Sequence, residues 1–374
     1  MSLEPIQVKE LVQKIIHKEE VHLLDIRRKN DVNAWAIEGE QVHSVNQTLP
    51  EIQENPEHVK SMLPSDEPVY VVCYKGISAQ AATAILQQAG MDNVTYLVGG
   101  MEAWGEHLEP VKVASLQQGA IHQFVRVGKG CLSYMIASGD EAVVVDPNRM
   151  IEVYLSFAQQ NGWTITHVID THLHADHISG GRMLAEKTGA TYWFPPEEEN
   201  VPFEYELLEH DMTFSLNNNS VSIQTIHTPG HTLGSTSLLI HDKYLLTGDT
   251  LFVTSIGRPD LAGKANEWTS LLYNTLYETI RAITHDVHIF PTHFSALHEL
   301  NKDGGVYSTK HSIYQSNYRL NIDSYQAFEN MITNNLPAQP NSYQEIRDIN
   351  MGKANVESSK WPTMEAGPNR CAVS

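Results

Sequence analysis

The first hundred residues alternate short apolar runs with a helical pattern. Apolar runs at 21–26, 68–74 and 94–100 have the length of buried strands, while 78–90 places small and apolar residues at helical spacing. Alternation of strands and helices is typical of a parallel sheet covered by helices. We therefore predict an α/β domain over residues 1–112.

The next part of the chain begins with consecutive apolar runs and has a different pattern. We predict strands at 121–127, 131–138, 141–147, 165–170 and 287–293, with a helix at 150–160. This order predicts two sheets with helices on their outer faces over residues 113–350. Residues 351–374 are polar, and we expect a mobile tail without regular structure there.

Composition and charge narrow the class of function. A chain of 374 residues suits two domains. Its 25 basic and 45 acidic residues give a net charge of −20, and the basic residues are scattered, which argues against nucleic acid or an anionic membrane as a partner. The sequence contains no apolar run of membrane-spanning length and no signal-peptide pattern, so we expect a cytoplasmic protein.

The three cysteines are far apart and odd in number, which fits a reducing compartment better than a disulfide framework. Cys73 ends a predicted strand and precedes a short loop and a helix. Backbone N–H groups and the positive end of that helix would stabilise a thiolate, with Lys75 nearby to hold an anionic sulfur compound. A buried, unreactive cysteine fits the same pattern equally well. We expect Cys131 in the core and Cys371 in the mobile tail.

The segments around Cys73 favour the reactive interpretation. "LLDIRRKNDVNAW" precedes it and "LVGGMEAW" follows it, and in this order and spacing residues 3–112 resemble rhodanese sulfurtransferases. The resemblance implies that Cys73 is a catalytic nucleophile that carries sulfane sulfur as a persulfide. It implies that Asp25 and Arg27 are buried positioning residues. It also implies that the 74–78 loop binds the sulfur substrate through Lys75, Gly76 and Ser78.

A second group of polar residues is concentrated in "DTHLHADHISG", residues 170–180. This segment contains His172, His174, Asp176 and His177. Three further residues, each just past an apolar run, are His231, Asp249 and His293. Imidazole and carboxylate groups together suit zinc, iron or manganese. Chance explains a pair of histidines but not this set at strand ends, so we predict a metal site.

The same residues resemble the metallo-β-lactamase superfamily over about 118–300, which implies an αββα sandwich. Two branches remain open. In the glyoxalase II branch, all seven residues would hold two zinc ions that hydrolyse a thioester. In the persulfide dioxygenase branch, two histidines and one aspartate hold a single Fe²⁺ per chain. The number of possible ligands alone does not separate these branches.

Three features favour the dioxygenase. Ala175 gives "HADH", the segment 248–261 resembles a dioxygenase "GRxD" segment, and 335–350 resembles the segment that closes dioxygenases fused to rhodanese domains. A rhodanese domain beside an enzyme that consumes sulfane sulfur is also a consistent pairing. The resemblance implies that the iron ligands are His172, His231 and Asp249. Around them, the supporting or second-metal residues would be His174, Asp176, His177 and His293, with catalytic roles for Asp176 and His177.

Arg258 is the natural holder of a substrate anion in an acidic chain, because guanidinium binds carboxylates in a bidentate manner. Thr232 and Asp260 are further candidates for substrate binding. Ser295 stands where the family carries a tyrosine that helps hold the tail of the thiol, so the identity of the thiol stays open.

The predicted reaction converts a low-molecular-weight thiol persulfide and O2 to sulfite and the thiol at iron. Cys73 would exchange sulfane sulfur among thiosulfate, sulfite and thiols. The alternative is a zinc thioester hydrolase with a sulfur-carrier domain. A third possibility is a sulfur carrier or sensor whose metal site is only structural. The resemblance implies a homodimer or homotetramer.

Overall fold

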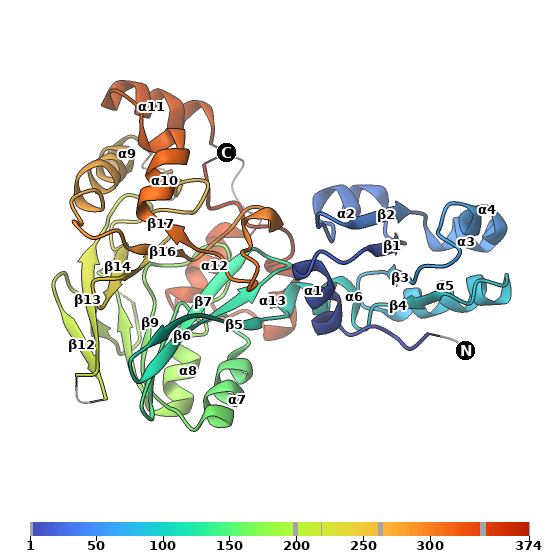
Figure 1. Ribbon diagram of the computed structural model, residues 1–374, viewed down its shortest axis with the longest axis horizontal. Coiled ribbons are helices and arrows are strands. Elements are labelled where there is room, and N and C mark those ends of the chain that lie inside the picture. The colour runs from blue at the N-terminus through green and yellow to red at the C-terminus, as the bar shows by residue number, and fades with distance from the viewer. Residues whose placement is uncertain (1–2, 197–200, 218, 261–264, 337–341, 374) are drawn as a thin grey trace. The chain divides into compact units, whose positions relative to one another are not determined.

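The computed structural model describes residues 3–196, 201–217, 219–260, 265–336 and 342–373 (Figure 1). It divides into two compact units. The N-terminal unit comprises Met1–Glu109, Arg126–Lys129 and Ala366–Pro368, and the C-terminal unit comprises Pro110–Val125, Gly130–Glu365 and Asn369–Ser374. Within the described residues, no helix has both the length and the apolar character that a membrane span requires.

The N-terminal unit is built on a four-stranded parallel sheet with the strand order β2-β1-β3-β4. Its strands are β1 (Val21–Asp25), β2 (Val42–Asn46), β3 (Val69–Val72) and β4 (Val94–Tyr96). Its helices are α1 (Val8–Ile16), α2 (Lys29–Ala34), α3 (Leu49–Glu54), α4 (Pro56–Ser61), α5 (Ile77–Gln88) and α6 (Gly100–Glu106). The prediction of a small α/β domain with a parallel sheet is confirmed.

Helix α5 shows why this unit folds as the pattern predicts. Its buried residues Ala79, Ala82, Thr83 and Leu86 follow the i, i+3, i+4, i+7 spacing that places side chains on one helix face. This face joins a core in which Val69 and Val71 of β3 and Val94 of β4 are also buried. The core therefore fixes the helix directly behind the Cys73 loop.

The C-terminal unit contains two sheets. One has seven strands in the order β11-β10-β9-β8-β7-β6-β5, namely β5 (Glu109–Leu116), β6 (Gly119–Arg126), β7 (Cys131–Ser138), β8 (Glu141–Val145), β9 (Thr164–Ile169), β10 (Thr191–Phe194) and β11 (Glu206–Leu207). The other has six in the order β12-β13-β14-β15-β16-β17, namely β12 (Thr213–Leu216), β13 (Val221–His227), β14 (Thr236–Ile240), β15 (Tyr244–Gly248), β16 (His288–Pro291) and β17 (Ser308–Thr309).

Helices lie outside both sheets (Figure 1). Helices α7 (Ile151–Asn161) and α8 (Gly181–Thr188) contact the seven-stranded sheet. Helix α9 (Ala265–Asn274), the π-helical turn Thr275–Thr279, α10 (Lys310–Ser316) and α11 (Tyr325–Asn334) cover the six-stranded sheet through a shared apolar cluster that contains Leu245, Leu272, Ile313 and Phe328. Helices α12 (Tyr343–Asn350) and α13 (Trp361–Met364) follow. The predicted αββα sandwich is confirmed.

The sandwich brings several strand ends to the same edge. Strands β8 and β9 pair in parallel, as do β15 and β16, so the chain leaves both members of each pair on the same side. Asp146 follows β8, the 170–180 segment follows β9, Asp249 follows β15, and His293 lies just past β16. The topology therefore gathers polar loops that are far apart in sequence.

The expectation of a mobile, unstructured C-terminal tail over 351–374 is wrong for the described part of that segment. Ala372 forms a bridge with Gly257, and the backbone N–H of Arg258 donates to the Cys371 carbonyl at 3.0 Å. The exposed fractions of Cys371 and Val373 are only 4% and 1%. Because the segment is polar on average, its composition did not reveal these two alternating apolar residues. Their burial offsets the conformational entropy that is lost when the chain end becomes ordered.

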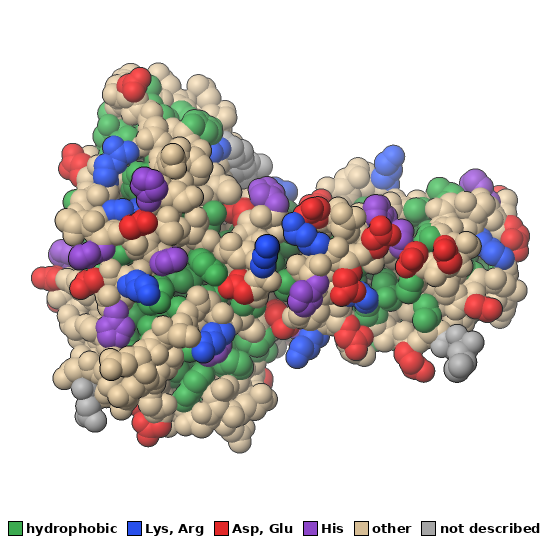
Figure 2. All heavy atoms as spheres, viewed as in Figure 1, with side chains coloured by type: hydrophobic (Ala, Val, Ile, Leu, Met, Phe, Trp, Pro, Cys, Tyr) green, Lys and Arg blue, Asp and Glu red, His purple; other side chains and the backbone are tan. Residues whose placement is uncertain are grey.

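On the face that Figure 2 shows, acidic and basic side chains are interspersed rather than gathered into broad patches of one sign. The absence of nucleic acid and membrane partners stays a prediction.

Replacement of Val373 tests the buried C-terminal segment. Val373→Asp places an unpaired carboxylate in the apolar cluster, so we expect the free energy of unfolding of the C-terminal unit to fall by about 3 kcal/mol or more. Thermal denaturation followed by circular dichroism measures the change. Asn355→Asp adds the same charge at an exposed position of the segment and should leave the midpoint unchanged. Equal midpoints for both variants would contradict the burial of Val373.

Candidate metal centre

The Cys73 loop is held tightly between β3 and α5. The carbonyls of Cys73 and Tyr74 accept hydrogen bonds from the backbone N–H groups of Met101 and Glu102, both at 2.9 Å. Gly76, the residue before α5, has φ +80°, and a side-chain carbon there would lie 2.9 Å from a backbone nitrogen. Only glycine fits this turn without strain, which explains its place in the loop.

The side chains of this loop have different environments. Cys73 is buried, with 6% of its surface exposed, whereas Ser78 is exposed on the first turn of α5. The Lys75 ammonium is largely exposed and lies 3.5 Å from the Glu102 carboxylate. The substrate-binding roles of Lys75, Gly76 and Ser78 stay predictions.

The expected burial of Asp25 and Arg27 is confirmed. The Arg27 guanidinium donates to both Asp25 oxygens and, at 2.6 Å, to the Trp35 carbonyl. This pair braces the segment that follows β1, and it therefore has a positioning role.

The structure brings together all seven predicted ligands in the C-terminal unit. They are His172, His174, Asp176, His177, His231, Asp249 and His293, each with at most 2% of its surface exposed. Their donor atoms form overlapping groups, each within 4.8 Å, that could hold a metal ion. Such density of ionisable groups away from water is typical of a functional site.

The predicted iron ligands form one of these groups. Nε2 of His231 lies 3.2 Å from Oδ2 of Asp249, and Nε2 of His172 lies 3.6 Å from the same oxygen. This Oδ2 is buried without a hydrogen-bond partner among the described residues. A buried carboxylate oxygen that faces two imidazole nitrogens is suited to share a cation with them, so these three residues fit a metal ion.

Hydrogen bonds orient the two imidazoles for this role. Nδ1 of His231 donates to the Arg258 carbonyl at 2.9 Å, which leaves a lone pair on Nε2. The Thr171 hydroxyl donates to Asp146, so it accepts a hydrogen bond from Nδ1 of His172 at 3.0 Å. Nε2 of His172 therefore also presents a lone pair toward Asp249.

Asp146 is a site residue that the sequence analysis did not identify. Its Oδ1 lies 3.0 Å from Nε2 of His174 and also accepts from the Thr171 N–H at 2.7 Å. Nδ1 of His174 is buried without a hydrogen-bond partner in the described part of the chain. The sequence did contain a signal for this residue: in "VVVDP", Asp146 ends an apolar strand, as Asp170 and Asp249 do.

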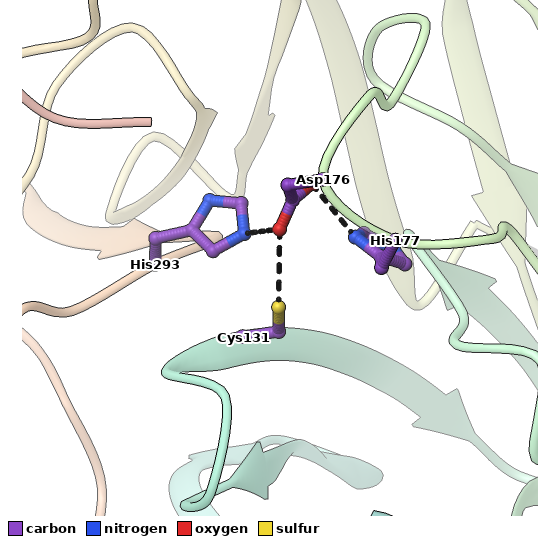
Figure 3. Close-up of side chains that lie close together, drawn as sticks. All are labelled: Cys131, Asp176, His177 and His293. Atoms are coloured by element: carbon purple, nitrogen blue, oxygen red, sulfur yellow. Dashed lines mark hydrogen bonds and ion pairs between the residues drawn. The ribbon is translucent and has the colours of Figure 1, made fainter. Parts of the chain in front are cut away.

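The remaining ligands form a second group around Asp176 (Figure 3). One carboxylate oxygen, Oδ2, lies 3.0 Å from Nε2 of His293 and accepts from the Cys131 thiol at 3.4 Å. The other, Oδ1, lies 3.0 Å from Nδ1 of His177. His293 in turn contacts Oδ1 of Asp249 through Nδ1 at 2.5 Å. His293 thus bridges the two carboxylates.

The electrostatic environment of the predicted iron ligands differs from that of the group around Asp176. Burial lowers the pKa of His172 and of His231, which keeps both rings neutral and able to bind a cation. Burial also opposes the charged forms of His177 and Asp176. The attraction between these two side chains outweighs the effect of burial and raises the pKa of His177 to about 10. Together with the attraction of His293, it lowers the pKa of Asp176 well below its usual range.

Asp249 is charged for a similar reason. Burial raises the pKa of its carboxyl group, but the nearby rings of His293, His172 and His231 lower it far below the usual range. The Thr292 hydroxyl also donates to Oδ1 of Asp249. The carboxylate is therefore ionised and able to bind a cation at ordinary pH.

Two cysteines belong to the centre, and no feature of their local sequence indicated this. Cys131 is buried as expected, but it lies in the Asp176 group rather than in a purely apolar core. Burial and the charge of Asp176 raise the pKa of this thiol, while His293 and His177 outweigh them and lower it. Cys371, expected in a mobile tail, lies with Asp249 and His293 in another possible ligand group.

Arg258 is buried and already has a carboxylate partner. Its guanidinium binds both oxygens of Asp260, at 2.7 and 2.8 Å, and donates to the Arg370 carbonyl at 3.1 Å. This pairing ties the 258–260 segment to the C-terminal residues. The roles of Arg258 and Asp260 in substrate binding stay predictions, as does that of Thr232, which is buried and bonds Ser235.

The end of α12 supports the histidine loop from outside. The Asn350 side-chain amide donates to the carbonyls of His174 and His177, at 2.8 and 2.9 Å. Asn350 is the last residue of the 335–350 segment that resembles dioxygenases fused to rhodanese domains. Residues 337–341 of that segment lie outside the described residues, and so does Leu261 of the 248–261 segment.

Two family profiles match the chain. The profile described as the metallo-beta-lactamase superfamily matches residues 126–303, and the rhodanese-like domain profile matches residues 8–107. Each profile falls in one unit of the structure, apart from residues 126–129. The candidate metal ligands lie within the first match, and Cys73 lies within the second.

Curated relatives carry the name hydroxyacylglutathione hydrolase. The protein of Pelagibacter ubique is 27% identical over 234 residues, which cover 61% of this chain and 90% of the relative. That of Xanthomonas euvesicatoria is 34% identical over 124 residues, or 33% of this chain and 47% of the relative. The chain thus spans only about half the length of the Xanthomonas protein.

Solved structures support the fold. A metallo-beta-lactamase from Staphylococcus aureus has a TM-score of 0.57 at 26% identity, covering 65% of this chain and 75% of that one. ETHE1 from Myxococcus xanthus has a TM-score of 0.54 at 24% identity, covering 63% of this chain and 99% of that one. The chain therefore combines an N-terminal rhodanese-like domain with a metallo-beta-lactamase domain.

Proposed function

We propose that the chain oxidises the sulfane sulfur of a low-molecular-weight thiol persulfide to sulfite with O2, at a single iron ion. The balanced reaction is R–S–SH + O2 + H2O → R–SH + SO3²⁻ + 2H⁺. One observation carries the proposal: His172, His231 and Asp249 present three donors of the two-histidine, one-carboxylate type in a chain that also matches the rhodanese-like domain profile. This donor set leaves open positions and is typical of non-haem iron oxygenases.

The protein's contribution is to hold the donors in place and exclude water. His231 is fixed by the Arg258 carbonyl, His172 by the Thr171 hydroxyl, and Asp249 by Thr292 and His293. Iron(II), when bound there, supplies the redox chemistry that joins oxygen to sulfur. His174 and Asp146 lie beside His172 and help fix the loop that carries it.

The Cys73 loop supplies the second half of the proposal. Attack of the Cys73 thiolate on the outer sulfur of thiosulfate would break its S–S bond, form an enzyme persulfide and release sulfite. Transfer to a thiol then gives R–S–SH, and each step can run in reverse. The loop between β3 and the N-terminus of α5 supports this role, because helix N-terminal N–H groups stabilise anions.

Thioester hydrolysis at two zinc ions is the second candidate. It is favoured by the relatives named hydroxyacylglutathione hydrolase and by the presence of all seven possible ligands in one place. Two zinc ions, if held by these residues, would supply the activation of water that thioester hydrolysis requires. The two proposals differ in the metal, in the substrate and in the need for O2.

Metal analysis and oxygen uptake test the first proposal directly. We expect one iron per chain in the purified protein and O2 consumption when a low-molecular-weight persulfide is added, with sulfite formed in equal amount. An iron-loaded protein that consumes no O2 with any such persulfide, yet hydrolyses glutathione or coenzyme A thioesters with zinc, would establish the second candidate instead.

Two aspartate variants separate the one-metal and two-metal mechanisms. Asp249→Asn removes an iron ligand, so we expect iron affinity to fall more than about 100-fold. Asp176→Asn lies outside the iron ligand set and should retain one iron per chain, whereas it should abolish a two-zinc hydrolase. Metal content after dialysis measures both. Loss of iron from Asp176→Asn equal to that from Asp249→Asn would be incompatible with the proposed ligand set.

Cys73→Ser separates the two activities. A serine hydroxyl cannot carry sulfane sulfur, so we expect transfer from thiosulfate to a thiol to fall by roughly 10³-fold or more. O2 uptake with a preformed persulfide should remain, because the iron ligands lie in the other unit. Both rates are measured on the same preparation. Loss of O2 uptake together with transfer would instead favour a sulfur carrier with a structural metal.

A further inference from the structure

We propose that Glu365 and Asn350 are positioning residues for the metal centre: they hold the backbone of the histidine loop, residues 170–180, in the conformation that presents its ligands. Both residues lie outside 126–303, the part of the chain that matches the metallo-beta-lactamase profile. The inference rests on the proposed metal site but not on the reaction performed there, so it applies whether the ion is iron or zinc.

The histidine loop runs from the end of β9 to the start of α8. Apart from a bridge of Ser179 with Asn148, its described residues have irregular backbone. Buried backbone N–H and C=O groups that lie outside helices and sheets need partners from elsewhere. The conformation of this loop therefore depends on residues outside it.

Glu365 joins the loop to the segment that follows β8. Its Oε1 accepts a hydrogen bond from the Ile178 N–H at 2.7 Å, and its Oε2 accepts one from Nε of Arg149 at 3.0 Å. Only 2% of the Glu365 surface is exposed. Replacing a buried ion pair by apolar side chains of similar volume often leaves a protein equally or more stable. The loop conformation that this pair selects therefore explains its presence better than the free energy of unfolding does.

Asn350, the last residue of α12, holds the same loop at three points. Its side-chain amide donates to the carbonyls of His174 and His177, at 2.8 and 2.9 Å. Its Oδ1 accepts from the Ser179 N–H at 3.0 Å. Because these contacts lie on both sides of Asp176, they restrict the backbone that carries this possible ligand.

An apolar cluster fixes helices α12 and α13 against the loop. Ile178 is buried together with Ile346 and Ile349 of α12, and Trp361 and Met364 of α13 pack against them. Burial of these side chains stabilises the arrangement without giving it direction, because the hydrophobic effect is non-directional. The hydrogen bonds of the two positioning residues therefore start from packed helices and determine the exact path of the loop.

Metal affinity is the property that this arrangement should control. The loop carries His172 of the proposed iron ligands as well as three further possible ligands. Coordinating groups must be held within about 0.5 Å of the productive geometry. Loss of a residue that orients ligands typically costs roughly 10–100-fold in metal affinity.

Cobalt binding in the absence of substrate tests the inference. We expect Asn350→Ala and Glu365→Ala to weaken Co²⁺ binding by the metal-depleted full chain roughly 10-fold or more. Competition with a chromophoric chelator measures the affinity, and the visible absorption bands of bound Co²⁺, which report coordination geometry, should change as well. Glu365→Gln retains an oxygen for the Ile178 N–H and should recover most of the affinity.

Matched controls separate positioning from general stability. Asn355→Ala and Glu357→Ala make the same changes at exposed positions and should bind Co²⁺ as the unmodified chain does. Ile332→Val removes a buried methylene group from the cluster over the six-stranded sheet, so it should lower the thermal midpoint without changing the affinity. Full affinity in both Asn350→Ala and Glu365→Ala, or affinities that merely follow the midpoints of all variants, would overturn the inference.

Hydrogen exchange of the unmodified chain decides if the alanine variants do not fold. The N–H groups of Ile178 and Ser179 should exchange slowly even without metal, because both are donors in buried or partly buried hydrogen bonds. Rapid exchange at both positions would refute the contacts. The expected Co²⁺ affinities in a protein that consumes no O2 would support the inference while the proposed function fails, and O2 uptake with unchanged Co²⁺ affinities would show the reverse.

Discussion

The carboxylate of Asp249 is the interaction on which the metal centre depends. It is fully buried, and three imidazoles surround it: His172 and His231 face one oxygen, and His293 contacts the other. A carboxylate in this environment is stable only if positive charge or hydrogen bonds compensate for lost hydration. The strand ends that converge on this edge of the sandwich supply that compensation, and the fold is therefore coupled to the chemistry of the site.

The same requirement explains why the supporting residues are arranged in pairs. His174 lies against Asp146, His177 against Asp176, and His293 lies between two carboxylates. His174 and His177 each have one nitrogen that contacts a carboxylate, whereas both nitrogens of His293 do, and these contacts fix the orientation of the rings. In His174 and His177 the other nitrogen is buried without a hydrogen-bond partner among the described residues. In His174, whose Nε2 contacts the Asp146 carboxylate, Nδ1 can carry the lone pair that a cation binds, whereas the raised pKa of His177 keeps that ring protonated.

The sequence was sufficient to predict the two domains, the αββα layers and the seven possible ligands, because each rests on a local signal. Strands and helices have their own periods, and polar residues just past an apolar run are visible without a structure. Asp146 carried this signal too and was overlooked. Cys131 and Cys371 carried none, since their approach to the centre depends on how β7 and the last residues pair with distant segments. The wrong prediction of an unstructured C-terminal tail has the same origin. The average polarity of a segment says little about its structure when two apolar residues account for its buried surface.

The three cysteines therefore have three different environments, although composition alone makes them equivalent. Cys73 lies at a strand end before a helix N-terminus and is the predicted carrier of sulfane sulfur. Cys131 lies in a buried group with the Asp176 carboxylate and the imidazoles of His177 and His293, and its thiol donates to that carboxylate. Cys371 is held beside Asp249 by backbone hydrogen bonds to the 256–258 segment. Because that segment also contains the carbonyl that orients His231, the end of the chain and the open metal site are coupled through Arg258.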